Sequence, residues 1–115
     1  MKKNHIFILL FLGAFFHSQT TDKKYLDSLN AEINKTQEPG KKIKNILLLS
    51  DYYRKKDTTK TYLLLKNAES IAGNNKELKG MVLVSKGISY TQTNPVKAKK
   101  ILLEADGLLK EFKTK

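Results

Sequence analysis

The side chains of this chain that could do chemistry are carboxylates, lysines and hydroxyls. The sequence has no cysteine and no tryptophan, and its two histidines, His5 and His17, fall within the first 18 residues, which carry the pattern of a removable leader. Without histidine or cysteine, the remaining chain has no histidine-dependent triad, no cysteine nucleophile and no ordinary zinc site. We therefore expect no metal and no cofactor.

Four carboxylates are the remaining candidates for acid or base chemistry. They are Asp51, Asp57, Glu69 and Glu104. None is set in a glycine-rich or apolar context that would shift its pKa, and the nearest acidic neighbour of Glu104, Asp106, points to a different face of the same helix. The glycines lack the spacing of a phosphate-binding loop. The sequence predicts exposed helix carboxylates, no catalytic residue and no enzymatic activity.

The N-terminal residues have the pattern of a secretory signal. An apolar run from Ile6 to Phe16 follows two lysines and precedes polar residues. Eleven helical residues span about 16 Å, against roughly 30 Å of membrane hydrocarbon, so a membrane span is disfavoured. We predict cleavage after Ser18, a mature chain beginning at Gln19, and a periplasmic or secreted location.

The formal net charge is +11, which raises the possibility of nucleic acid or anionic surfaces as partners. The lysines are spread through every segment, with only short clusters, and no nucleic-acid-binding motif is present. This distribution favours solvated helix faces over a phosphate-binding stripe.

Apolar residues recur at helical spacing through the whole region after the leader, with no competing strand pattern. The expected helices run from Asp22 to about Gln37, from Lys41 to Lys56, from Thr58 or Thr59 to Ala72, from Lys76 to Gln92, and from Pro95 to about Phe112.

Turn and capping residues separate these helices. Residues 38–40, Glu-Pro-Gly, are expected to end the first helix, and residues 73–75, Gly-Asn-Asn, to supply left-handed residues that close the third. Asn94 is expected to cap the fifth helix, with Pro95 as its first residue. Gly87 lies in the middle of a helix, where it allows two packed helices to approach closely.

The sequence repeats itself with a period of 37 residues. Small residues coincide at Ser50 and Gly87, aromatic residues at Tyr53 and Tyr90, helix-start residues at Asp57 and Asn94, and alanines at Ala68 and Ala105. A fixed period of this size is typical of stacked helix-turn-helix units, none of which buries its apolar face alone. The predicted fold is all-α, with antiparallel helix-turn-helix repeats.

Over residues 41–112 the chain resembles tetratricopeptide repeat proteins. The small residue, the aromatic residue one turn later and the alanines of the second helix occupy that family's positions, although the period exceeds the usual 34 and Thr61 stands where alanine is expected. The resemblance implies a solenoid fragment of about five helices after the signal. The expected divisions are a signal peptide at 1–18, a leading helix and linker at 19–40, repeat 1 at 41–75, repeat 2 at 76–112 and a tail at 113–115.

In that family the first helix of each unit lines the inner, partner-binding surface. Those positions here are Lys44, Leu47, Asp51, Arg54 and Lys55 in the first unit, and Met81, Val84, Ile88, Thr91 and Gln92 in the second. The predicted partner contacts are Lys44, Asp51, Arg54, Lys55, Ile88, Thr91 and Gln92. A surface that mixes charged, apolar and amide groups suits an extended peptide or a partner helix.

Three functions remain open on the sequence. The leading hypothesis is an exported, non-catalytic module that binds protein or peptide. The second is a truncated N-terminal sensory segment of a signalling or transcription-regulating protein, because the chain also resembles the exported repeat regions of Bacteroidetes-type sensor kinases and helix-turn-helix regulators. The third is a basic surface binder of nucleic acid or anionic envelope polymers.

The last predicted helix carries more apolar residues than one preceding helix is expected to cover. They are Ile101, Leu102, Leu108, Leu109 and Phe112. We therefore expect the chain either to self-associate through this helix, with Leu109 and Phe112 as the contacts, or to be only marginally stable.

Overall fold

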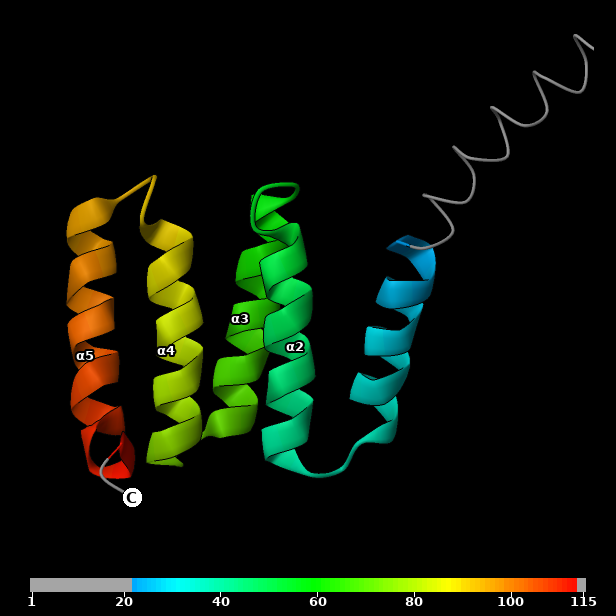
Figure 1. The fold of residues 1–115 in the computed structure, drawn as a ribbon, viewed down its shortest axis with the longest axis horizontal. Coiled ribbons are helices and arrows are strands. Elements are labelled where there is room, and N and C mark those ends of the chain that lie inside the picture. The colour runs from blue at the N-terminus through cyan, green and yellow to red at the C-terminus, as the bar shows by residue number, and fades with distance from the viewer. Residues whose placement is uncertain (1–21, 114–115) are drawn as a thin grey trace, which may run out of the picture.

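The computed structural model describes residues 22–113, and the predicted signal peptide lies outside them. Within this range the chain is entirely helical apart from its turns (Figure 1). The elements are a leading helix at residues 22–35, α2 (Pro39–Tyr53), α3 (Thr58–Ala72), α4 (Lys76–Tyr90) and α5 (Pro95–Lys113). The predicted all-α fold is confirmed.

The helices form two antiparallel hairpins that stand side by side. α2 packs on α3 and α4 packs on α5, while α4 also contacts α3 and α2. In Figure 1 the helices follow one another in a row, with the leading helix at one end and α5 at the other. This is the arrangement of helical repeats, in which each hairpin buries part of its apolar surface against the next.

The 37-residue period of the sequence is also the period of the structure. α2 and α4 begin at Pro39 and Lys76, and they end at Tyr53 and Tyr90. Both pairs of positions are one period apart. The second helices also begin one period apart, at Thr58 and Pro95, but α5 continues to Lys113, beyond the position equivalent to the end of α3 at Ala72.

The second helix of each hairpin begins with the same capping bond. The backbone N–H of Lys60 donates to Asp57 Oδ1 at 3.1 Å, and the backbone N–H of Lys97 donates to Asn94 Oδ1 at 3.1 Å. Each cap satisfies an amide of the first turn that has no partner within the helix. The predicted caps at Asp57 and Asn94 are confirmed.

A cation–π contact repeats at the same interval. Lys60 Nζ lies 4.4 Å from the ring centroid of Tyr53, and Lys97 Nζ lies 4.3 Å from that of Tyr90. In both hairpins, a lysine in the first turn of the second helix covers the last aromatic residue of the first helix. Such pairs stabilise the turn by attraction between the ammonium group and the ring face.

The start of α2 differs from the prediction. The leading helix ends at residue 35, and Pro39 and Gly40 belong to α2 rather than to the linker. Glu38 is the N-cap, and its carboxylate accepts from the backbone N–H groups of Gly40 at 2.8 Å and Lys41 at 2.7 Å. Proline is tolerated at the first helical position because its missing N–H would have no intrahelical partner there. The two backbone donors lower the pKa of Glu38.

The turn between α3 and α4 also differs in part. Gly73, with φ 54°, is the one residue with positive φ in the described chain, so the two asparagines that follow it do not close α3 in a left-handed conformation. Asn75 instead caps α4, where its Oδ1 accepts from the backbone N–H of Leu78 at 3.0 Å. One turn therefore ends a helix with glycine and begins the next with asparagine.

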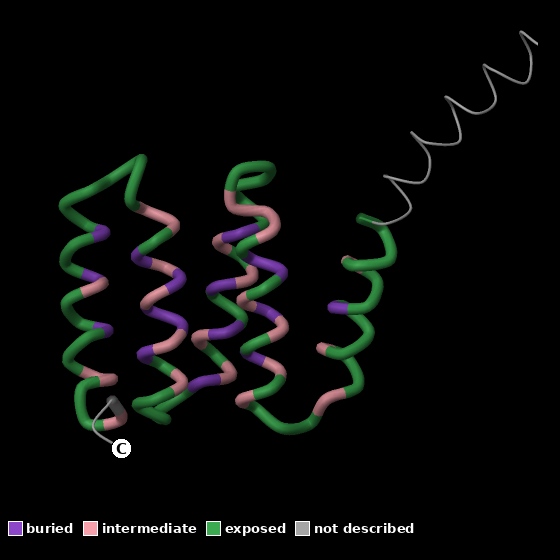
Figure 2. Tube along the Cα trace, in the orientation of Figure 1, coloured by how far each residue is buried: buried purple, intermediate pink, exposed green. Residues whose placement is uncertain are grey.

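Buried residues recur along the sides of the helices that face neighbours (Figure 2). One cluster joins the two hairpins, and its members are Ile43, Ile46, Ala68, Ala72 and Val82. A second cluster lies between α4 and α5, and its members are Leu83, Ile101 and Ala105. The core is thus distributed along the row of helices.

The leading helix covers the free side of α2. Leu29 is buried, and Ile33 packs against the first cluster. Tyr25 and Tyr52 meet with ring centroids 6.2 Å apart, and burial raises the pKa of Tyr52, to which the nearby Asp22 carboxylate adds. The leading helix therefore closes one end of the row.

Two glycines of α4 allow α5 to approach closely. A Cβ at Gly87 would lie 2.7 Å from Leu102 Cγ, and one at Gly80 would lie 2.6 Å from Leu109 Cγ. The prediction for Gly87 is confirmed. Leu109, expected as a contact for self-association, packs on Gly80 within the hairpin and is half-buried, and its contact with a second copy stays a prediction. The exposed apolar residues of α5 are Val96 and Leu103.

Candidate functional site

Three hollows follow one another along the face formed by α2 and α4, hereafter the α2–α4 face. The largest, about 540 Å³, lies at the C-terminal ends of the two helices. A second of about 320 Å³ lies beside the middle of α2, and a third of about 450 Å³ lies at the N-terminal ends. The second and third share Lys44 as a lining residue.

The seven predicted contact residues all line these hollows. The largest hollow is lined by Arg54, Lys55, Thr58, Tyr62, Ile88, Ser89, Thr91, Gln92 and Thr93. Lys44 and Asp51 line the middle hollow. The structure thus brings residues of the two units, far apart in the sequence, onto one face. Their contact with a partner remains a prediction.

Arg54 connects the two hairpins at the largest hollow. Its Nη2 pairs with Asp51 Oδ1 one turn earlier in α2, and its Nε donates to Ser89 Oγ of α4 at 3.4 Å. The hydroxyl of Ser89 donates in turn to the backbone carbonyl of Ser85 at 2.9 Å. The guanidinium is therefore held in place while part of it stays accessible to solvent.

The α2–α4 face offers several kinds of contact group. Ile88 is 40% exposed and Leu48 is 46% exposed, so apolar side chains are accessible on both helices. Exposed Lys44 and Lys55 supply cations, and Gln92 supplies an amide that both donates and accepts. This combination can hold a peptide by its side chains and by its backbone.

Sequence reasoning missed four lining residues of the largest hollow and misplaced one residue. Thr58, Tyr62, Ser89 and Thr93 line it in addition to the predicted set. Val84, expected on the inner surface, packs against the cluster between α4 and α5 instead. The spacing of Ser89 four residues after Ser85 on α4 was the available signal for Ser89.

Three of the four candidate acid or base carboxylates have structural partners. Asp51 pairs with Arg54, Asp57 caps α3, and Glu69 Oε1 accepts from Lys86 Nζ at 2.8 Å across the α3–α4 contact. The fourth, Glu104, is exposed on α5. No group of three or more acidic side chains in residues 22–113 is placed to hold a metal ion.

By its fold and its α2–α4 face, this protein belongs to the class of all-α proteins with a repeat-like row of helical hairpins. No family model, curated protein or solved structure matches the chain. In the part that the structure describes, no helix has the length and apolar character needed to cross a membrane.

Proposed function

We propose that this chain is a non-catalytic helical-repeat module, similar to tetratricopeptide repeat proteins, that binds a protein or peptide segment along its α2–α4 face. The observation that carries the proposal is the gathering of all seven predicted contact residues at three neighbouring hollows. All seven lie on the first helix of a hairpin, α2 or α4, or within two residues of its C-terminal end. Repeat modules use the inner surface formed by these helices in the same way.

An extended peptide suits this face better than a compact small molecule does. The three hollows lie in a line along α2 and α4 instead of forming one enclosed cavity. Apolar peptide side chains would pack on Ile88 and Leu48, and acidic ones would pair with Lys44 or Lys55. Backbone amides of the peptide would bond to Thr91 and Gln92.

The first prediction concerns affinity at the largest hollow. For linear peptides selected on the full chain from a random library, we expect Ile88→Ala to weaken binding at least about tenfold, because it removes an accessible apolar contact at the centre of the site. Fluorescence anisotropy with labelled peptides measures the dissociation constants. Leu63→Ala is the matched control, since Leu63 is an exposed apolar residue of α3 that lines none of the three hollows.

Unchanged affinity in Leu63→Ala together with the loss in Ile88→Ala supports the proposed face. Equal effects of the two substitutions, or no selectable peptide at all, would contradict it. Circular dichroism of each variant separates lost binding from lost folding.

We also propose that the protein is exported, on the strength of the basic start and the apolar run from Ile6 to Phe16. The expected mature chain begins at or near Gln19, because a signal peptide is removed after its apolar segment. Intact mass and N-terminal sequencing of the protein recovered from the envelope or the medium measure this. A chain that retains Met1 in the membrane fraction would contradict export by cleavage.

A further inference from the structure

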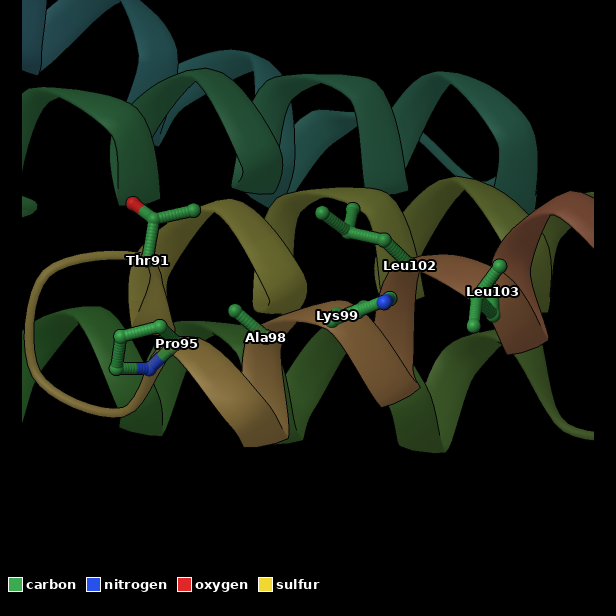
Figure 3. Close-up of a pocket in the computed structure, with 6 residues that line it drawn as sticks. All are labelled: Thr91, Pro95, Ala98, Lys99, Leu102 and Leu103. Atoms are coloured by element: carbon green, nitrogen blue, oxygen red, sulfur yellow. The ribbon is translucent and has the colours of Figure 1, made fainter.

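A fourth hollow lies at the end of the row formed by α4 and α5 and shares one lining residue, Thr91, with the largest hollow of the α2–α4 face. It has a volume of about 340 Å³ and is lined by Thr91, Pro95, Ala98, Lys99, Leu102 and Leu103. Figure 3 shows that most of these side chains come from one stretch of α5, with Thr91 at the end of α4. Beside it, Val96 is 82% exposed and Leu103 is 63% exposed.

The hollow on α5 is equivalent, 37 residues later in the sequence, to a surface of α3 that α4 covers. Leu102 corresponds to Leu65 of α3, which is 2% exposed and lies beside Lys86 and Tyr90 of α4. Leu102 itself remains partly exposed. The hollow on α5 therefore lies where, one period earlier, a second helix packs. Residues 22–113 do not supply a helix at this position.

The internal junction shows which contacts such a helix makes. Tyr90 of α4 stacks on Tyr62 of α3 with ring centroids 5.0 Å apart, and Lys86 pairs with Glu69 at 2.8 Å. One period after Tyr62 stands Lys99, a lining residue of the α5 hollow. If a helix docked on α5 as α4 docks on α3, its residue equivalent to Tyr90 would therefore lie next to Lys99.

The side chains at the open end are more apolar than those at the equivalent inner positions. The first unit has Thr59 and Lys66 where the second has Val96 and Leu103, and all four positions are exposed. Val96 and Leu103 are seven residues, or about two turns, apart and so lie on one side of α5, where exposed apolar residues are typical of a contact surface. The α5 face therefore carries apolar residues at the places where an inner junction is polar.

Charge complementarity selects the occupant. Lys99, which lines the hollow, is exposed, and the whole chain has a net charge of +11. A second copy of the chain would bring further lysines to the contact, whereas a helix with carboxylates beside its apolar stripe would pair with them. A bilayer offers no shape that fills the hollow between α4 and α5.

We propose that the outer face of α4 and α5 docks an amphipathic α-helix of a partner protein, with apolar residues over Leu102 and Leu103 and a carboxylate facing Lys99. Apart from Thr91, this surface is formed by other residues than the α2–α4 face, so the protein would have two docking sites that meet at the end of α4. The docked helix extends the row of helices by one member, covers Leu102 as α4 covers Leu65, and contacts Leu103 at the edge of the junction.

The test uses α4 itself as the template of a probe. A labelled peptide of residues 76–92 carrying Tyr90→Glu, the glutamate peptide, is titrated with the full chain. The same peptide carrying Tyr90→Lys, the lysine peptide, is the charge-reversed comparison. We expect the full chain to bind the glutamate peptide at least about fivefold more tightly than the lysine peptide, and Lys99→Glu to reverse this preference. The substitution Leu103→Lys in the full chain should weaken its affinity for the glutamate peptide at least about tenfold.

Two controls make the result specific. Leu63→Lys changes a leucine that is as exposed as Leu103, at 63%, on α3, and should leave binding unchanged. A peptide that also carries Gly80→Pro should bind poorly, because proline in a helix interior breaks the docked conformation.

Several outcomes would overturn the proposal. They are failure of both peptides to bind, equal loss in Leu63→Lys and Leu103→Lys, and a preference that Lys99→Glu does not reverse. A dimer that Leu103→Lys dissociates in sedimentation, without peptide binding, would assign the face to a second copy. Binding to anionic phospholipid vesicles without peptide binding would assign it to a membrane surface.

Discussion

Replacing Ile46 by alanine should lower the free energy of unfolding by about 2–5 kcal/mol, since the change removes buried methyl groups and leaves a cavity. The side chain of Ile46 is fully buried in the cluster that also contains Ala68 of α3 and Val82 of α4. The cavity would open where the two hairpins meet, so both would lose contacts. Small domains have total stabilities of about 5–15 kcal/mol, so this loss would remove a substantial fraction of the stability.

Urea denaturation followed by circular dichroism measures this loss. Leu48→Ala is the control, because Leu48 lies on the same helix and is 46% exposed. We expect it to cost less than about 1 kcal/mol, since little apolar surface is lost and no closed cavity forms. Equal losses in the two variants would show that α2 does not pack against α3 and α4 as described.

Enlarging the repeat alanines should also be destabilising. Ala68 is 0% exposed and Ala105 is 1% exposed, and each stands where two helices pack closely. We expect Ala68→Leu and Ala105→Leu each to cost about 1–3 kcal/mol, because the added atoms have no space unless the helices separate. The two costs should be similar, since the positions are equivalent in the two hairpins.

Thermal melts of Lys55→Ala and Lys99→Ala provide the comparison. Both lysines are exposed, so each change should alter stability by no more than about 0.5 kcal/mol. If the lysine variants melted well below the alanine variants, the assignment of Ala68 and Ala105 to helix–helix contacts would be wrong.

The helix boundaries that could be predicted are those set by local chemistry. Asp57 and Asn94 cap their helices through an amide three residues later, so the signal and its effect lie within one turn of the chain. The 37-residue period is likewise visible in the sequence, because equivalent positions in stacked hairpins meet equivalent surroundings. The all-α fold followed from these local signals.

The sequence was less informative where one residue type serves two purposes. Proline ends one helix and begins another with equal ease, so the sequence did not show that Pro39 opens α2. The direction of Leu109 depends on the missing side chain of Gly80 in a different helix. Such a contact is tertiary, and no spacing within α5 reveals it.

The candidate site divides in the same way. Lys44, Asp51 and Arg54 lie on one face of α2 by helical spacing, so their shared exposure to the α2–α4 face was predictable. Tyr62 belongs to α3 and reaches the largest hollow only because that helix packs between α2 and α4. Its position depends on how the hairpins stack, which the sequence of one unit does not specify.

The short turns of this fold bear on how quickly it forms. Four residues separate α2 from α3, and four separate α4 from α5, so each hairpin closes over a small loop. Contacts between neighbours in sequence require little loop-closure entropy, and proteins with low contact order fold in microseconds to milliseconds. We expect either hairpin to be able to nucleate folding, with the Tyr62 and Tyr90 stack formed as the second hairpin joins the first.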